Sequence, residues 1–397
     1  MEKVDSPLLK DKRLRWIDAS RGFAILGILM VNLPAFNGPF FLYGGGENYW
    51  SSSVDPLIRS LIDIFFQASF YTLFSFLFGF GIQIIVEKLT QKQLEVGKTI
   101  FRRLFILIGF GLIHAFVIWH GDILLSYGII GLLLLAFFKR KNITLLGWAF
   151  GLLLIPTVLY TFLLYLVRDQ LDFVNDVAIQ AAFQNYGNGS LVEIWQQNYY
   201  DWSYGGVIYN YFFLIIGLLP LFLLGMVTAR KRWLHHVQKY RAFLNKVWWV
   251  TLSLFLFVKV GPHMIGNPSW MSSFQDNIGG TASALFYIVS ITLAYQNSTF
   301  KRFLKPLEKV GRMSLTNYIL QSIICFLLFY SVGFGLYGKV SPLASIGLVM
   351  IIFTVQILFS HKWLKHFRFG PLEGLWRSLT YQQKLPLKRN QRREEEL

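Results

Sequence analysis

Residues 13–32 read RLRWIDASRGFAILGILMVN, a basic start followed at once by an apolar run. The run is long enough to cross a bilayer as one helix. Asp18 and Arg21, three residues apart, share one face of that helix where the run begins. Ionisable groups at the edge of a span are costly, so we interpret them as a structural pair that fixes its inner end. Asn32 follows about 21 Å further along the same helix.

The composition of the whole chain repeats this pattern. Apolar residues make up 54% of the 397 residues and charged residues 15%, whereas a soluble domain carries more charge. Apolar runs recur along the whole length, and they are continuous rather than alternating, which favours helices over a β-barrel. The sequence therefore predicts an all-α, polytopic transmembrane bundle. The net charge of +17 does not indicate nucleic-acid binding, because the basic residues lie between the spans.

The apolar runs predict about ten spans with both chain ends in the cytoplasm. Their expected ranges are 17–36, 57–86, 104–119, 123–138, 143–167, 209–229, 244–262, 278–296, 313–333 and 342–361. Cytoplasmic loops carry an excess of Lys and Arg. Only four of the 38 Lys and Arg fall away from the segments that this topology places inside: Arg59, Arg168, Lys259 and Lys339.

Three segments flank or interrupt the expected ten-helix domain at 17–361. Residues 1–16 form a basic cytoplasmic segment and residues 362–397 a basic cytoplasmic tail. Residues 168–208 form an acidic, aromatic stretch outside the cytoplasm, which suits an interfacial helix or a partial lid. The single Cys325 excludes an intrachain disulfide and a cysteine cluster for a metal. We expect no cleavable signal peptide, because the first run has no small-residue cleavage site after it.

A few polar side chains lie at membrane depth. His114 lies roughly 16 Å above the foot of its span, and Asp122 follows at the outer turn. Together with Asn32 they form a candidate catalytic group, because a histidine beside a carboxylate is a usable general base. The alternative is that His114 bonds a backbone carbonyl between helices. His120 is interpreted as an interfacial residue.

A second polar stripe opens the ninth span, in GRMSLTNYILQS at 311–322. Asn317 and Gln321 share a face that must contact protein or a cavity. They predict either the wall of a cytoplasmic entry channel or hydrogen bonds between helices. Arginines lie at the feet of this span and of the third span, where they would meet ligand phosphates or serve as plain anchors: Arg102, Arg103 and Arg312.

Two further stretches are interpreted as structural. GPLEGLWRSLTY at 370–381 predicts a short helix that docks under the bundle, with Glu373 and Arg377 as an i,i+4 pair. SFLFGFGIQ at 75–83 allows close helix packing through its glycines. It follows no strand, so it is no nucleotide-binding fingerprint.

These motifs together resemble a known family. The first stretch, SFLFGFG, HGDIL, GRMSLTNYILQS and GPLEGLWR occur in order between about residues 13 and 381, and they resemble the bacterial YeiB-like family, also called domain of unknown function 418. That family is a set of inner-membrane proteins, sometimes interpreted as transporters. Its first span is similar to that of heparan-α-glucosaminide N-acetyltransferase and of integral-membrane sugar O-acyltransferases.

The second likeness implies an activity. Those acyltransferases take an acyl group on the cytoplasmic side, from acetyl-CoA where the donor is known, and deliver it to an acceptor on the far side. In the lysosomal enzyme a first-span asparagine matches Asn32, and in the O-acyltransferases a histidine ends the first span at about the same place. This chain has no histidine in the loop after its first span. The catalytic base must therefore come from elsewhere, and His114 is the candidate.

We therefore expect a transmembrane acyltransferase with acyl-CoA as donor and neither a metal nor a covalently bound cofactor. His114 would deprotonate an acceptor hydroxyl or amine, Asp122 would orient it, and Asn32 would stabilise the developing charge. The acceptor would lie outside the cytoplasm, such as a sugar or a cell-envelope glycan. A small-solute transporter and a non-catalytic membrane scaffold are the alternatives, and a homodimer is compatible with each.

Overall fold

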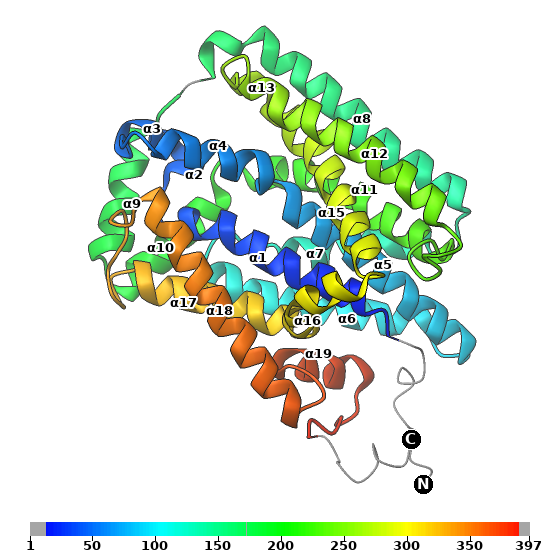
Figure 1. Ribbon diagram of the computed structural model, residues 1–397. Coiled ribbons are helices and arrows are strands. Elements are labelled where there is room, and N and C mark those ends of the chain that lie inside the picture. Colours follow the sequence, from blue (N-terminus) through cyan, green and yellow to red (C-terminus); the bar gives the residue numbers. More distant parts are fainter. Residues whose placement is uncertain (1–12, 172, 389–397) are drawn as a thin grey trace.

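The computed structural model describes residues 13–171 and 173–388. Within them every named element is a helix, so the predicted all-α class is confirmed. Figure 1 shows the long helices packed alongside one another in a bundle. Most of the predicted segment 1–16 and the end of the predicted tail lie outside the described residues.

Eight helices in the described part of the chain are long and apolar enough to cross a membrane, which establishes a multi-pass membrane protein. They are α1 (Arg15–Asn37), α4 with α5 (Asp55–Gln91), α6 with η1 (Val96–Ile118), α8 (Asn142–Leu166), α11 (Val207–Arg230), α12 to α13 (Arg241–His263), η5 to α15 (Ser269–Ala294) and α18 (Pro342–His366). A bent pair would be a ninth span, and the predicted span at 123–138 corresponds to the shorter apolar helix Leu124–Phe137. The count of ten and the inside–outside assignment stay predictions.

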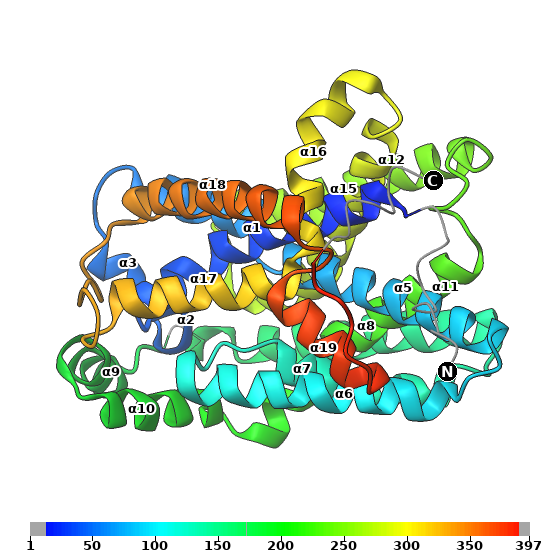
Figure 2. The same cartoon turned by 90° about the horizontal axis from the view of Figure 1, so that it is seen from below.

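The bent pair consists of α16 (Ser298–Arg312) and α17 (Ser314–Phe329), which meet at an angle of 80°. In Figure 2, α17 runs along the bundle while α16 stands away from it. α16 is amphipathic and carries basic residues such as Lys301 and Arg302 on a helix too polar to cross a membrane alone. The predicted ninth span is therefore α17, and α16 has the character of an interfacial helix.

The first stretch of the sequence forms α1, which lies inside the bundle and packs against α5, α15, α16, α17 and α18. Two glycines permit its close approach to α16. A Cβ atom on Gly22 would lie 2.0 Å from the Leu307 carbonyl oxygen, and one on Gly311 would lie 1.9 Å from the Asp18 carbonyl oxygen. The glycine after Arg21 and the glycine that opens the GRMSLTNY motif are therefore required for one backbone contact.

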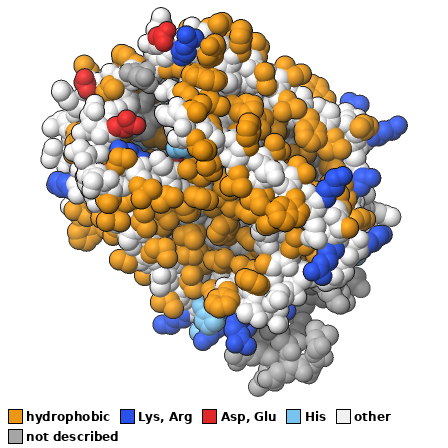
Figure 3. Space-filling view, turned by 45° about the horizontal axis from the view of Figure 1, so that its top comes forward, with side chains coloured by type: hydrophobic (Ala, Val, Ile, Leu, Met, Phe, Trp, Pro, Cys, Tyr) orange, Lys and Arg blue, Asp and Glu red, His pale blue; other side chains and the backbone are white. Residues whose placement is uncertain are grey.

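The surface fits a membrane environment. Figure 3 shows a broad hydrophobic surface, with Lys and Arg gathered toward one side and the Asp and Glu of this view on the other. The apolar side chains of α8 are mostly exposed, Ile155 among them. Such a surface is stable against lipid and not against water.

Short helices pack against the long ones (Figure 2). The acidic, aromatic segment forms α9 (Asp176–Asn188) and α10 (Leu191–Ser203). α10 packs on η1 (His114–Ile118), where the Trp195 indole donates a hydrogen bond to the Val117 carbonyl at 3.1 Å. The last helix of the described chain, α19 (Pro371–Tyr381), packs on α6 (Val96–Ile113) and α17.

Candidate functional site

A cavity of about 940 Å³ lies between α1, α5, α6, α17 and α19. One face of α1 lines it from Arg13 to Ile28, a distance of about 22 Å along the helix. Its outer part is lined by the basic segments at the end that carries α19. Its deep part is apolar and ends at Leu124, Tyr127 and Tyr318. This volume is in the range of small-molecule and cofactor sites.

The charged residues of the cavity wall are mostly basic. The wall holds seven Lys or Arg and three carboxylates: Arg13, Arg21, Lys88, Arg103, Arg232, Arg312 and Arg377, with Asp18, Glu87 and Glu373. Asp18 pairs with Arg13 and, at 3.3 Å, with Arg21. Arg232 contacts Glu87 at 2.6 Å. The predicted pair of Asp18 and Arg21 is thus present, and both residues also line the cavity mouth.

Two arginines of the wall have an aromatic ring instead of a carboxylate as partner. The guanidinium of Arg103 lies 3.6 Å from the ring centroid of Trp376, and that of Arg377 lies 4.4 Å from Phe369. The Nε of Arg103 is buried without a hydrogen-bond partner in the described chain, and burial lowers the pKa of Arg377. Stacked guanidinium groups keep N–H donors free, which suits a phosphate.

The sequence predicts that Glu373 pairs with Arg377, four residues later. In the structure, the Glu373 carboxylate forms its hydrogen bonds with α17 instead. Its carboxylate accepts the backbone N–H groups of Leu315 (2.7 Å) and Thr316 (3.1 Å) and the Thr316 hydroxyl (2.6 Å). It therefore satisfies the free N–H groups at the start of α17. The hydrogen bonds of Glu373 hold α19 against the bundle. The Trp376 indole adds a further one, which it donates to the Arg103 carbonyl at 2.9 Å.

A buried His–Asp pair lies beyond the deep end of the cavity. His114 Nδ1 lies 2.9 Å from Asp122 Oδ1, and Nε2 forms a 2.7 Å hydrogen bond with Ser322 Oγ on α17. His114 begins the π-helix η1, a type of helix that is frequent at functional sites. Asp122 is held in turn by the backbone N–H of Leu125 at 2.5 Å. The structure thus brings the two predicted residues into contact and adds Ser322, which the sequence prediction missed.

Tyr318 connects the cavity with this pair. Its side chain lines the deep end of the cavity, and its ring centroid lies 5.0 Å from that of His114. Ser314, Tyr318 and Ser322 recur every four residues and share one helix face. That spacing is the feature of the sequence from which Tyr318 and Ser322 could have been predicted as site residues. The sequence prediction followed Asn317 and Gln321 on the neighbouring face instead.

Two polar residues expected to line the entry channel, Asn317 and Gln321, have other partners. The Asn317 amide donates to the carbonyl of Val310 and to Ser360 Oγ at 3.0 Å. The Gln321 amide donates to the Ile25 carbonyl at 3.2 Å and also to Gln356. Both are buried between α17, α1 and α18, as the alternative interpretation of the stripe has it.

Arg102 and Arg312 were both predicted to meet ligand phosphates, but only Arg312 lines the cavity. Arg102 donates to the Thr380 carbonyl at 3.1 Å and does not line the cavity, because the helix turns it away from its neighbour Arg103. Arg312 lines the cavity and also donates to the Arg368 carbonyl at 3.2 Å. Arg377 therefore replaces Arg102 as a candidate for contact with a ligand phosphate.

Asn32 continues the cavity face of α1, four residues beyond Ile28. Its side chain is partly exposed and forms no hydrogen bond within the described residues. The structure therefore leaves its amide free and does not bring it into hydrogen-bond contact with His114.

His120 belongs to a separate buried cluster. Its Nδ1 lies 3.5 Å from Asp201 of α10, and burial lowers the pKa of His120. The hydroxyl groups of Tyr43 and Tyr186 also donate to Asp201, the latter at 2.7 Å. Three different segments thus hold α10 in place through one carboxylate.

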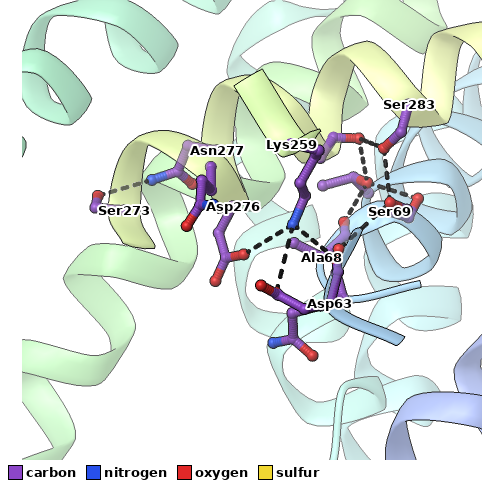
Figure 4. Close-up of polar contacts among 12 residues, drawn as sticks. Asp63, Ala68, Ser69, Lys259, Ser273, Asp276, Asn277 and Ser283 are labelled. Carbon is purple, nitrogen blue, oxygen red and sulfur yellow. Dashed lines mark hydrogen bonds and ion pairs between the residues drawn. The ribbon is translucent and has the colours of Figure 1, made fainter. Parts of the chain in front are cut away.

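A second ionic cluster lies between α4, η4 (Leu256–Val260) and η6 (Gln275–Gly279), two of these being π-helices. Figure 4 shows the Lys259 side chain reaching toward Asp276 and Asp63. Lys259 is fully buried, with Nζ 3.4 Å from Asp276 Oδ1 and 3.3 Å from the Asp63 carbonyl oxygen. His263 Nε2 lies 2.9 Å from Asp63 Oδ2. Each charged group has a partner, so the cluster fixes the three helices rather than offering a free ligand.

The chain is similar in sequence to proteins of Bacillus and of Escherichia coli. The family described as "Protein of unknown function (DUF418)" matches residues 228–383. The uncharacterized protein YxaH of Bacillus subtilis is 37% identical over 395 residues, which covers 94% of this chain and 96% of that protein. The uncharacterized protein YeiB of Escherichia coli is 30% identical over 392 residues, which covers 92% and 95%. No solved structure gives a significant match.

Proposed function

The chain belongs to the DUF418 family, and we propose that it is an acyltransferase that works across the bacterial inner membrane. It takes an acyl group from cytoplasmic acyl-CoA and transfers it to a hydroxyl or amine of an acceptor outside the cytoplasm. The observation that carries the proposal is the cavity itself. Its basic end includes Arg103, which stacks on Trp376, and its deep end includes Tyr318, which packs on a buried His–Asp pair.

The donor would bind with its nucleotide at the basic end. Arg103 and Arg377 offer guanidinium N–H groups to the phosphates, and Arg312 stands beside them on the wall. The apolar walls formed by Ile25 and Ile28 suit the arm that carries the thioester. The thioester would then lie near Tyr318, one side chain away from His114.

The chemistry would fall to His114. With a proton on Nδ1, the nitrogen beside Asp122, the Nε2 atom is the one that accepts a proton from a hydroxyl or amine. Asp122 stabilises the imidazolium that forms. Asn32 stays the candidate for the acyl oxygen, because it continues the α1 face that lines the cavity and its amide is unused.

A small-solute transporter is the second candidate, and one observation favours it. The break between α4 and α5 at Phe66–Ala68 and the bend between α16 and α17 are discontinuities of the kind found at transporter sites. A transporter would bind a solute in the cavity without cleaving a thioester. The scaffold interpretation gives no role to a cavity of this size.

The test is calorimetric binding of acetyl-CoA to the detergent-solubilised protein. We expect micromolar binding that Arg103→Ala weakens about 10- to 100-fold, since a hydrogen bond to a charged group contributes about 1.5–3 kcal/mol. Arg102→Ala is the matched control, because Arg102 is the residue next to Arg103 and does not line the cavity. His114→Ala should keep the binding and lose transfer.

Two results would overturn the proposal. One is the absence of binding for acetyl-CoA and octanoyl-CoA alike. The other is an equal loss of affinity in Arg102→Ala and Arg103→Ala, because it would place the ligand outside this cavity. Either result would leave the transporter as the leading candidate.

A further inference from the structure

Ser322 stands in line with the His–Asp pair. Ser322 Oγ lies 2.7 Å from His114 Nε2, and His114 Nδ1 lies 2.9 Å from Asp122 Oδ1. The three side chains come from α17, η1 and the turn before α7 (Leu124–Leu132), and none is more than 2% exposed. A hydroxyl, an imidazole and a carboxylate in this order form the arrangement that activates a serine nucleophile.

The polar contacts of His114 are compatible with that chemistry. Nδ1 is the ring nitrogen that lies against the Asp122 carboxylate, and a neutral histidine with its proton on Nδ1 has Nε2 as its acceptor. The Ser322 hydroxyl then donates to Nε2. The competing acceptor for that hydroxyl is the Tyr318 carbonyl, at the longer distance of 3.3 Å.

We propose that Ser322 carries the acyl group between donor and acceptor as a covalent ester, an inference that rests on the proposed function. Ser322 Oγ attacks the thioester carbonyl while His114 Nε2 takes the hydroxyl proton. The C–S bond breaks, and the CoA sulfur leaves with that proton as a thiol. The acceptor then loses its proton to His114, attacks the ester carbonyl and displaces Ser322, whose oxygen recovers the proton.

The residues around the triad explain why a covalent intermediate would be useful. Tyr318 lies between the cavity and His114. Trp119 follows η1, its backbone N–H donates to the His114 carbonyl at 2.9 Å, and its buried ring stacks on Phe36 with centroids 4.1 Å apart. The side chains of the triad are therefore enclosed by protein. An acyl group held on Ser322 lets the donor leave before the acceptor enters, so the two sides need never be open together.

The test is incubation of the solubilised protein with [14C]acetyl-CoA in the absence of acceptor, followed by mass spectrometry of the peptides. We expect about one acetyl group per protein on Ser322, with release of an equal amount of CoA. Ser322→Ala should bind acetyl-CoA and remain unlabelled. Ser345→Ala, which also removes a buried hydroxyl, should label normally. Ser322→Cys should restore labelling as a thioester that neutral hydroxylamine cleaves.

The opposite results separate this inference from the function on which it rests. Protein that binds acetyl-CoA but carries no acetyl group, or carries it on His114 with label retained in Ser322→Ala, overturns the role of Ser322 and leaves the acyltransferase standing. Protein that binds neither acetyl-CoA nor octanoyl-CoA overturns both.

Discussion

Asp122 and His114 contact each other at 2.9 Å across the junction between α6 and α7, and Asp122 is itself fixed by the Leu125 backbone N–H. The carboxylate lies against Nδ1 and favours a proton on that nitrogen. In the proposed reaction, Asp122→Asn should lower the single-turnover rate of CoA release from acetyl-CoA by about 10²- to 10⁴-fold. The affinity for acetyl-CoA should stay unchanged.

The control for this prediction is His120→Ala, which alters the histidine that contacts Asp201 instead. It should keep the rate within a few-fold of the wild type, whereas His114→Ala should abolish it. Equal rates for wild type and Asp122→Asn at saturating acetyl-CoA would show that the pair is a structural contact alone.

Tyr318 separates the cavity from His114, so its size should control leakage. Tyr318→Ala would join the cavity to the site and admit water along the path of the thioester. We expect faster acetyl-CoA hydrolysis without acceptor, measured as free thiol over time. Tyr318→Phe keeps the ring and should hydrolyse acetyl-CoA no faster than the wild type. Slower hydrolysis in Tyr318→Ala than in Tyr318→Phe would mean that the ring positions the donor instead of closing its path.

The sequence was sufficient for the fold class because apolar runs of span length leave few alternatives in a membrane. Each of the ten expected segments is matched by a helix. The bend between α16 and α17 was not foreseen, since Arg312 and Ser314 are compatible with one continuous helix. It depends on a tertiary contact, because Glu373 caps the start of α17 from a helix almost 60 residues later.

The sequence predicts site residues correctly only where their depth along the helix is enough to bring them together. His114 and Asp122 were paired because a tight turn places them at the same level. The choice among neighbouring polar residues failed, because a rotation of only about 100° about the helix axis separates Arg103 from Arg102, and Tyr318 from Asn317. Rotation about a helix axis is set by packing against neighbouring helices, and a single sequence does not contain that information directly.

The buried Lys259 makes a testable contribution to stability. Lys259→Met removes the cation between Asp63 and Asp276, and breaking a buried charge cluster in this way costs about 3–5 kcal/mol. We expect a clear fall in the Tm of the detergent-solubilised protein. Adding Asp276→Asn to Lys259→Met should recover part of it, because the second change removes one of the carboxylates left without a cation. Additive losses in the double variant would mean that the two residues are not coupled.

Glu373 should make the docking of α19 depend on pH. Burial raises the pKa of Glu373 above its ordinary value of 4.5. A carboxyl group with a raised pKa binds its proton more tightly in the folded state than in the unfolded state, so its contribution to stability is fully present below 4.5. That contribution declines as the pH rises through 4.5 toward the raised value. The Tm of the wild type relative to Glu373→Gln should therefore fall as the pH rises across this window.

The comparison with glutamine isolates the charge, because Glu373→Gln keeps an oxygen for the backbone N–H groups of Leu315 and Thr316. Glu373→Ala removes the cap altogether and should cost about 0.5–2 kcal/mol at any pH. It should also weaken acetyl-CoA binding, since Trp376 and Arg377 enter the cavity wall on the same helix. A Tm difference between wild type and Glu373→Gln that rises with pH would contradict the prediction, because it would mean that the folded state favours the charged carboxylate.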